Sequence, residues 1–390
     1  MLTTYFSVTT VKFLGRILNI ITHYIILSNY GLETYGLIFG AIATAELFSI
    51  PFKASLPTWL NRYLRYVHYD KKIQVIKVFW LCLIVALTLA SIGTYFLLDG
   101  LKTLEMWQSI SLFYIIYFFS QFCSATRAGL LRAANRITVS QIITQLINPF
   151  AFLCFIFLFL KFEIMPGNAV IQALVAISLS QYFTASLSLV MLRSNLKNEI
   201  PNDVPSKPSL ISIIFSEGFK QAENLLPIVL CNAFGLSVIA GTYRIYQLVT
   251  SSFRLTNSAS SLMIQTSTPI LNAKTFLENQ KLFSLSGLLG MGVSCGILAY
   301  VIQTNTLGYG SIITMICLIT LGVIQNFIGP VFGALAITKI TTYMLTIIIT
   351  GLLLQLLLLG MSIQLGYSDL AIILYLFAGT LKGWILKRSF

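Results

Sequence analysis

Long apolar runs, separated by short polar breaks, follow one another along almost the whole chain. A helix needs roughly 20 apolar residues to cross a bilayer core about 30 Å thick, and the runs have this length. We therefore predict an all-α integral membrane protein with about 12 transmembrane helices. The predicted spans cover residues 5–27, 36–58, 75–98, 107–126, 139–160, 168–192, 210–232, 237–259, 282–303, 309–330, 342–363 and 368–386.

The composition agrees with this pattern and excludes a soluble protein. Hydrophobic residues make up 57% of the chain and charged residues only 9%, whereas a soluble domain carries about 25% charged residues. The six cysteines lie inside apolar runs without paired spacing, so neither a disulfide framework nor a metal site is predicted. The sequence also lacks a phosphate-binding loop of the nucleotide-hydrolysing type. We expect no cofactor.

The formal net charge of +13 is explained by membrane topology. With a cytoplasmic N-terminus, seventeen basic residues fall in the inner segments and only Lys102 and Lys161 in the outer ones. Basic residues gather in cytoplasmic loops of membrane proteins. We therefore predict that both termini are cytoplasmic, and the excess charge does not indicate a nucleic-acid partner.

One polar connection divides the chain into two halves. Residues 193–209 replace the apolar pattern with polar residues and three prolines, Pro201, Pro205 and Pro208, and no helix persists through such a segment. We predict an N-terminal six-helix bundle over 1–192, a cytoplasmic linker over 193–209 and a C-terminal six-helix bundle over 210–390. Two related bundles of this kind are typical of transporters whose halves move about a central site.

Polar residues recur at helical spacing inside four spans. In the first span Lys12, Arg16, Asn19 and His23 are spaced by 4, 3 and 4 residues, which places them on one face of a helix. Charged groups inside a bilayer cost roughly 2.5–3.5 kcal/mol each, so we predict that these stripes line one water-filled cleft between the halves. The other stripes consist of Glu46, Ser49 and Lys53, of Glu217, Lys220 and Asn224, and of Arg244, Gln247, Ser251, Arg254 and Ser258.

The predicted cleft is basic. Its six cations outnumber the three carboxylates Glu46, Glu217 and Glu223, which favours an anionic substrate. Guanidinium groups bind phosphate in a bidentate manner and ammonium groups supply point charge, so a diphosphate headgroup suits this mixture. The candidate binding residues are Lys12, Arg16, Lys53, Lys220, Arg244 and Arg254.

Two of these assignments have alternatives. Lys12 and Lys53 lie near the inner boundary of their spans, and their long side chains can instead extend to the membrane surface. Glu46 can pair with Lys53 on its own face or with Arg254 across the bundle, or it can bind a proton or a cation. The sequence leaves structural pairing and ion coupling equally open for Glu46.

Several residues near the ends of spans are interpreted as boundary residues. His23 lies near the outer end of the first span. Tyr35 and Trp59 also lie near span ends, where aromatic side chains commonly anchor a helix at the membrane–water interface. We expect all three at that interface.

Three segments resemble the polysaccharide flippases of the Wzx type. The first combines Lys12, Gly15 and Arg16 with residues 30–36, Tyr-Gly-Leu-Glu-Thr-Tyr-Gly, and the second is the basic segment 127–136 after the fourth span. The third runs from Gly235 through Gly-Thr-Tyr-Arg at 241–244 to Pro269. These flippases belong to the MOP superfamily, which also contains the multidrug MATE exporters and the peptidoglycan-precursor flippases.

The resemblance implies a function and a setting. It implies a MOP/MATE-like fold that moves undecaprenyl-diphosphate-linked oligosaccharide units, for O-antigen or a related polysaccharide, across a bacterial inner membrane. The implied partners are the lipid-linked glycan, the bilayer and other membrane proteins of polysaccharide assembly, with H⁺ or Na⁺ coupling left open. The alternatives, in falling order, are a MATE-like cation-coupled drug exporter, a polysaccharide polymerase or ligase, and a membrane scaffold.

Overall fold

The computed structural model describes most, but not all, of the chain. It covers residues 2–50, 53, 55–63, 80–81, 83–85, 87–88, 92, 104–134, 136–164, 168–195, 210–248, 309–328, 331, 341–366 and 368–388, and these residues are almost entirely helical. The chain forms two compact units, Met1–Thr242 and Tyr243–Phe390. The predicted linker falls mostly outside the described residues, so the division into two six-helix bundles stays a prediction.

The first helix, α1 (Leu2–Phe48), is a pair of helices joined at Gly31. Gly31 has φ 76° and ψ 169°, a backbone conformation that residues with a side chain rarely adopt. An unbroken helix would separate residues 23 and 39 by about 24 Å, but the rings of His23 and Phe39 stack with centroids 4.2 Å apart. The chain therefore folds back at Gly31, and the two spans predicted over 5–27 and 36–58 are antiparallel neighbours.

The remaining helices match the predicted spans closely. The predicted spans that begin at residues 107, 139, 168, 210, 309, 342 and 368 each correspond to a described helix or run of helices. The predicted span 282–303 lies outside the described residues, as does most of 75–98, and 237–259 is described only to residue 248, where it is helical. The helices are α2 (Leu56–Tyr63), α4 (Leu104–Ala133), α5 (Ile137–Gln141), the π-helix η3 (Ile142–Ile147), α6 (Asn148–Lys161), α7 (Ala169–Asn195), α8 (Leu210–Ala233), α12 (Tyr309–Ile328), α14 (Thr342–Gln364) and α15 (Ser368–Arg388).

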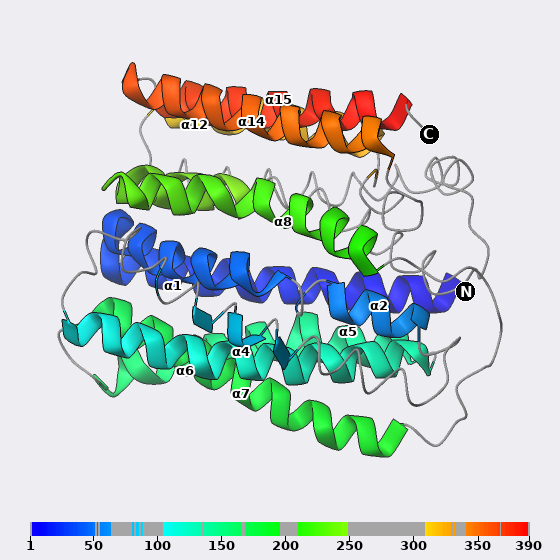
Figure 1. The fold of residues 1–390 in the computed structure, drawn as a ribbon. Helices are drawn as coiled ribbons and strands as arrows, with labels where there is room; N and C mark the ends of the chain where they lie inside the picture. Colours follow the sequence, from blue (N-terminus) through cyan, green and yellow to red (C-terminus); the bar gives the residue numbers. More distant parts are fainter. Residues whose placement is uncertain are drawn as a thin grey trace. The chain divides into compact units, whose positions relative to one another are not determined.

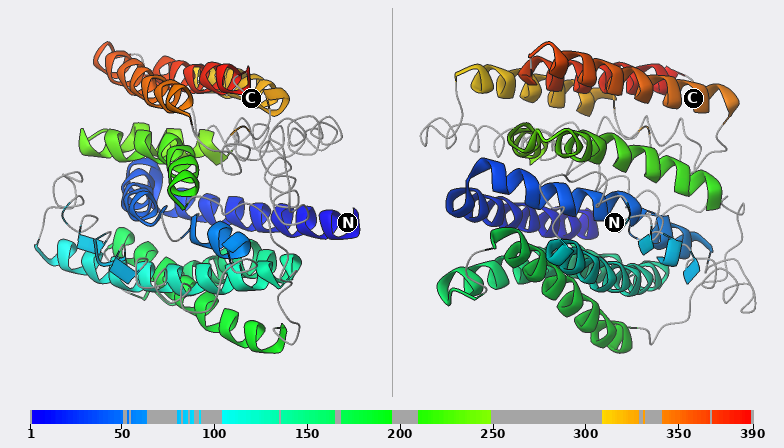
Figure 2. Two further views of the ribbon diagram at one scale, coloured as in Figure 1. Left: turned by 45° about the vertical axis from the view of Figure 1, so that its right-hand side comes forward. Right: turned by 60° about the vertical axis from the view of Figure 1, so that its left-hand side comes forward.

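The first unit is a layered helical bundle (Figures 1 and 2). Helix α4 packs against α2 and α7, α6 packs against α1 and α7, and α8 lies along α1. The buried side of α4 is aromatic, with Tyr114, Tyr117 and Phe118 fully buried. The Tyr114 hydroxyl donates a hydrogen bond to the Ala41 carbonyl oxygen at 3.3 Å, which joins α4 to the second half of α1.

The fifth predicted span is continuous but irregular. Helix α5, the π-helix η3 and α6 follow one another from Ile137 to Lys161. Pro149 lies in the first turn of α6, and because proline has no backbone N–H, the Gln145 carbonyl loses its usual donor four residues ahead. A π-helical turn is one way in which a helix adapts to such a change. The same carbonyl oxygen lies against Gly15 of α1.

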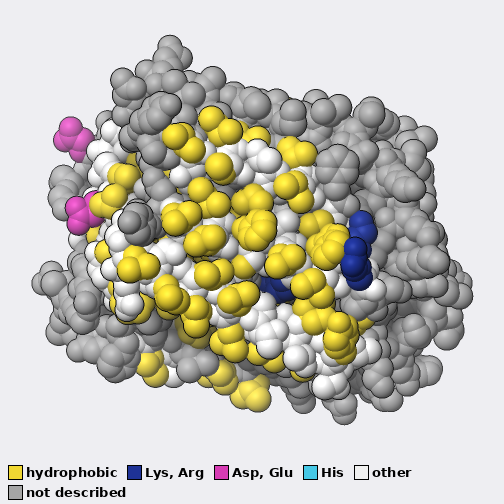
Figure 3. Space-filling model, turned by 90° about the horizontal axis from the view of Figure 1, so that it is seen from above, with side chains coloured by type: hydrophobic (Ala, Val, Ile, Leu, Met, Phe, Trp, Pro, Cys, Tyr) yellow, Lys and Arg dark blue, Asp and Glu magenta, His cyan; other side chains and the backbone are white. Residues whose placement is uncertain are grey.

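The second unit contains α12, α14 and α15, of which α15 packs on both others. Thr341 caps α14, its hydroxyl accepting a hydrogen bond from the Met344 N–H at 3.2 Å. Large apolar side chains on this unit are more than half exposed, among them Tyr343, Leu353 and Phe377. Figure 3 shows the resulting apolar surface, with basic side chains at one end. Such a surface is unfavourable in water and suits contact with lipid.

Five of the helical stretches that the structure describes are long and apolar enough to cross a membrane. One of them is the stretch Ser7–Phe48, which contains the turn at Gly31. The prediction of an all-α membrane protein is therefore confirmed, although the number of spans is not fixed by the described residues.

Candidate functional site

The polar stripe of the first span lies on the buried side of its helix. Lys12 and His23 are each only 6% exposed, whereas Leu14, Ile21 and Tyr24 on the opposite face are 41–44% exposed. A helix that buries a lysine while exposing leucine and isoleucine is oriented for lipid outside and for protein or water inside. Lys12 is thus placed within the packed first unit.

A close backbone contact holds this part of α1 in place. A Cβ atom added to Gly15 would lie only 1.6 Å from the Gln145 carbonyl oxygen, so only glycine allows α1 to approach the π-helix η3 this closely. Arg16, the next residue, is half-buried. The contact therefore fixes the depth of both Lys12 and Arg16 relative to the π-helix.

Glu46 and Lys53, both within the second predicted span, form an ion pair. Helix α1 ends at Phe48, and beyond it the Lys53 N–H donates to the Ser49 carbonyl at 2.8 Å. The side chains of Lys53 and Glu46 are 35% and 21% exposed, and Tyr117 of α4 lies near Lys53. Structural pairing, one of the alternatives for Glu46, is confirmed, while an additional role in ion coupling stays a prediction.

The other predicted cleft residues are placed less completely. Lys220 lies on α8, with its side chain outside the described part of the structure, and Arg254 lies outside the described residues altogether. Arg244 belongs to the second unit, where its guanidinium Nη1 donates a hydrogen bond to Gln247 Oε1. This bond confirms that Arg244 and Gln247 share a helical face. The convergence of all four stripes on one cleft stays a prediction.

His23, Tyr35 and Trp59 do not face lipid headgroups as interface anchors would, because their side chains are buried. Their depth in the membrane stays a prediction. His23 Nδ1 lies 2.6 Å from the Tyr35 hydroxyl, and the imidazole stacks on Phe39 at 4.2 Å. Tyr35 and Trp59 are 0% and 2% exposed. Hydropathy placed these residues near span ends, but the fold-back at Gly31 turns His23 and Tyr35 toward each other instead of toward lipid headgroups.

The second unit contains a buried lysine, which the sequence analysis counted only among the seventeen basic residues of the inner segments. Lys382 of α15 is 3% exposed and donates from Nζ to Gln355 Oε1 of α14 at 3.0 Å. Gln355 Nε2 in turn donates to the Tyr375 carbonyl at 3.0 Å. The signal that could have revealed this contact is a lone amide inside the apolar run of α14, because polar residues in such runs bind across helices.

A second missed contact joins α1 and α8. The Asn232 amide Nδ2 donates to the Gly36 carbonyl at 3.1 Å and to the Ile228 carbonyl at 2.9 Å. Gly36 and Gly40 are four residues apart, the spacing of small residues in close helix contacts. A Cβ atom on Gly36 would lie 1.8 Å from the Ser237 carbonyl oxygen, and one on Gly40 would lie 2.4 Å from Asn232 Nδ2.

Comparison with known proteins identifies the fold. No protein-family model and no curated protein matches the sequence. The chain matches over 99% of its length a MATE transporter in complex with MaD5, covering 95% of it with TM-score 0.64 and 13% identity. The MATE multidrug transporter DinF-BH gives TM-score 0.59 at 15% identity, over 99% of this chain and 94% of that one.

A further match is the outward-facing form of a multidrug resistance MATE family transporter of the MOP superfamily. It gives TM-score 0.60 at 13% identity, over 99% of this chain and 94% of that one. The chain therefore has the fold of the MATE transporters of the MOP superfamily. Together with its exposed apolar helices, this fold makes it a multi-pass membrane protein.

Proposed function

We propose that this protein is a flippase that moves a polyprenyl-diphosphate-linked oligosaccharide from the inner to the outer leaflet of a bacterial inner membrane. Both termini are cytoplasmic in this proposal, since the basic residues then lie in the inner segments. Undecaprenyl-diphosphate-linked units of O-antigen or a related surface polysaccharide are the proposed cargo. Membrane proteins of polysaccharide assembly are the proposed further partners.

The observation that supports an anionic cargo is the charge of the buried face of α1. Lys12 is 6% exposed and Arg16 half-buried on that face. The structure describes the side chains of four carboxylates of the first unit. Glu33 and Glu163 are exposed, Glu46 is paired with Lys53, and Glu223 is half-buried on α8.

The proposed mechanism is alternating access, in which one side of the protein closes as the other opens. The diphosphate enters an inward-open basic cleft, where Lys12, Arg16, Lys220 and Arg254 hold it by charge-assisted hydrogen bonds. The polyprenyl tail stays in the lipid. Lys53 and Arg244 are the other two basic residues that we assign to this cleft.

Ion coupling is assigned to Glu46 within the same proposal. Its carboxylate is paired with Lys53, and uptake of a proton or a cation would weaken that pair and so favour one of the two conformations. Glu46→Gln should remove the dependence of transport on a proton or Na⁺ gradient while leaving exchange driven by the substrate gradient. The rate in proteoliposomes with and without each gradient measures this, and an unchanged gradient dependence contradicts the assignment.

A cation-coupled multidrug exporter is the second candidate, favoured by the likeness of the fold to MATE multidrug transporters. Such an exporter should have carboxylates available for a cationic drug. The two candidates therefore differ in the sign of the charge that their cargo carries, and one assay can test both.

The experiment measures transfer in proteoliposomes of a fluorescent polyprenyl-diphosphate glycan and, separately, of a cationic dye. Removing one charge-assisted contact costs about 1.5–3 kcal/mol, so Arg16→Gln should lower glycan transfer by about 10- to 100-fold. Lys161→Gln is the matched control, because Lys161 is an exposed cation at the end of α6. Arg254→Gln tests the predicted second half of the cleft in the same way.

One outcome would correct the site, and a second would reject the proposal. Transfer that is equally fast in the Arg16→Gln and Lys161→Gln variants removes Arg16 from the site. Failure of the folded protein to move several glycans, combined with export of the cationic dye, establishes the exporter instead.

A further inference from the structure

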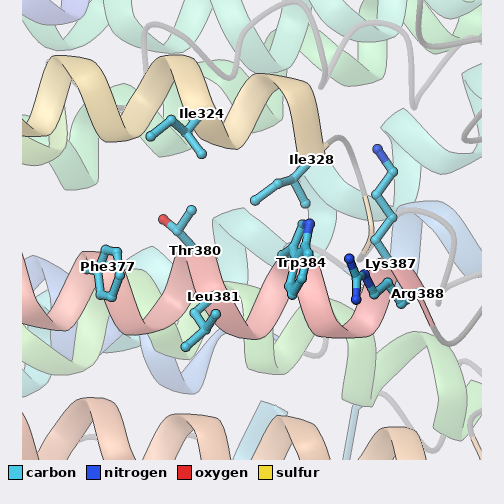
Figure 4. Close-up of a pocket in the computed structure, with 8 residues that line it drawn as sticks. All are labelled: Ile324, Ile328, Phe377, Thr380, Leu381, Trp384, Lys387 and Arg388. Carbon is cyan, nitrogen blue, oxygen red and sulfur yellow. The ribbon is translucent and has the colours of Figure 1, made fainter.

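A groove runs between α12 and α15 in the second unit (Figure 4). It encloses about 710 Å³. Ile328 forms part of its floor and is 8% exposed, whereas Ile324, Phe377 and Leu381 at its sides are 43–54% exposed. The groove therefore opens to the surroundings of the protein along an apolar path.

A ligand in the groove does not need to form a hydrogen bond with Thr380. Thr380, a polar residue that lines the groove, is only 7% exposed. The Thr380 hydroxyl donates to the Leu376 carbonyl at 2.8 Å and accepts from Gln325 Nε2, also at 2.8 Å. Because both functions of this hydroxyl are used within the protein, a hydrocarbon chain can cover it without leaving a buried group unsatisfied.

One end of the groove is basic. Lys387 and Arg388, in the last turn of α15, line it beside Trp384. The Arg388 guanidinium carbon lies 3.6 Å from the centre of the Trp384 ring, a cation–π arrangement that orients the guanidinium. Tryptophan is enriched where a helix passes the lipid headgroups. The basic end therefore lies at headgroup level and the apolar part reaches into the hydrocarbon core.

The length of the groove fits a lipid. Phe377 and Arg388 are eleven residues apart on one helix, which corresponds to about 16 Å along its axis. Half of a bilayer core is about 15 Å thick. An acyl chain that begins at Arg388 would thus extend along the groove to about the middle of the membrane.

We propose that this groove is a binding site for one anionic phospholipid of the leaflet in which α15 ends. Lys387 and Arg388 bind the phosphate and the anionic headgroup, and one acyl chain lies along Leu381 and Phe377. Under the proposed topology this is the cytoplasmic leaflet, where basic side chains near the surface favour anionic lipids. The inference requires only that the protein lies in a membrane, and it does not depend on the proposed cargo.

The test measures lipids retained by the intact, purified protein after delipidation and titration with phosphatidylglycerol or phosphatidylcholine, read by native mass spectrometry. At about 1 kcal/mol per basic side chain, Arg388→Gln should weaken phosphatidylglycerol binding about 5-fold and Lys387→Gln/Arg388→Gln about 30-fold. Phosphatidylcholine binding should change little. Leu381→Trp, which fills the groove with an apolar ring, should weaken both lipids.

The matched control is Lys161→Gln. Lys161 is also an exposed cation at a helix end, with its Nζ 5.8 Å from the centre of the Phe162 ring, but it does not line the groove. The proposal predicts unchanged phosphatidylglycerol binding in this variant. Equal losses in Lys161→Gln and Arg388→Gln would show general surface attraction and overturn the site.

Competition decides between a resident phospholipid and the tail of a transported lipid. A polyprenyl phosphate that displaces phosphatidylglycerol from the intact protein, and loses that ability in the Leu381→Trp variant, would assign the groove to the cargo's tail and overturn the proposal. Retention of phosphatidylglycerol against excess polyprenyl phosphate supports it.

Discussion

The α1–α8 contact and the α14–α15 contact both place a polar side chain against a glycine, but the two polar side chains differ in charge and in their hydrogen-bond acceptors. In each, a polar side chain of one helix lies over a glycine of its neighbour, Asn232 over Gly40 and Lys382 over Gly351. Asn232 is a neutral amide that donates to backbone carbonyls. Lys382 is a cation that donates to the side chain of Gln355.

The difference concerns what each contact can tolerate. Next to Gly40, Gly36 faces the Ser237 carbonyl, a backbone group that cannot rotate away, so the α1–α8 contact is restricted by shape. The α14–α15 contact is restricted by charge, because a buried ammonium must keep its acceptor. We therefore expect the first contact to be most sensitive to added volume and the second to loss of a hydrogen bond.

Added volume at Gly36 should have the largest effect. In Gly36→Ala the new methyl group would lie 1.8 Å from the Ser237 carbonyl oxygen, so the helices must separate, and overpacking of this severity costs about 3 kcal/mol or more. The measurement is reversible unfolding of the purified protein in mixed micelles. Gly360→Ala is the control, because a Cβ atom there has no neighbour within 4 Å, and it should be neutral or stabilising by up to about 1 kcal/mol. Equal stability of the two variants would contradict the close contact.

Loss of the acceptor for Lys382 should have the next largest effect. Gln355→Leu keeps the side-chain size but removes the oxygen that Lys382 Nζ approaches at 3.0 Å, which should cost about 2–3 kcal/mol because the buried partner is charged. Gln355→Leu/Lys382→Met removes the charge as well and should recover most of the loss. Additive effects of Gln355→Leu and Lys382→Met would show that the two side chains are not coupled.

The sequence predicts the spans well because the bilayer fixes both their length and their polarity. Residues 342–363 and 368–386 were predicted as helices, and α14 and α15 occupy almost the same ranges. The partners of individual polar residues follow less directly. Gln355 is visible as a lone amide in an apolar run, but sequence spacing does not say that its partner is Lys382, twenty-seven residues further along the chain.

In the candidate site, too, some features could be predicted from the sequence and others could not. Helical periodicity correctly grouped Lys12 and His23 on one face, and both are buried. The pairing of Glu46 with Lys53 was one of the predicted alternatives and is observed. The neighbours of His23 could not be predicted, because they depend on the fold-back at Gly31, which a hydropathy pattern marks as a break between spans without giving its geometry.

Loss of the neutral amide in the α1–α8 contact should have the smallest effect of the three. Asn232→Leu removes two hydrogen bonds to backbone carbonyls, but side-chain hydrogen bonds between membrane helices contribute only about 0.6 kcal/mol on average. Among the described residues, Asn232 Oδ1 is buried without a hydrogen-bond partner, so the substitution also removes an unfavourable group. Its stability in the same micelles should therefore stay within about 1 kcal/mol of the unmodified protein.

Volume, not polarity, then decides the α1–α8 contact, and a larger side chain at the same place makes this testable. Asn232 already lies close to Gly40, because a Cβ atom added to Gly40 would lie 2.4 Å from the Asn232 amide nitrogen. The larger ring of Asn232→Phe therefore cannot fit beside Gly40, and this variant should destabilise the protein clearly more than Asn232→Leu. If Asn232→Leu instead costs as much as Gln355→Leu, the amide is as essential to its contact as the acceptor of Lys382 is to the other, and the contrast between shape and charge fails.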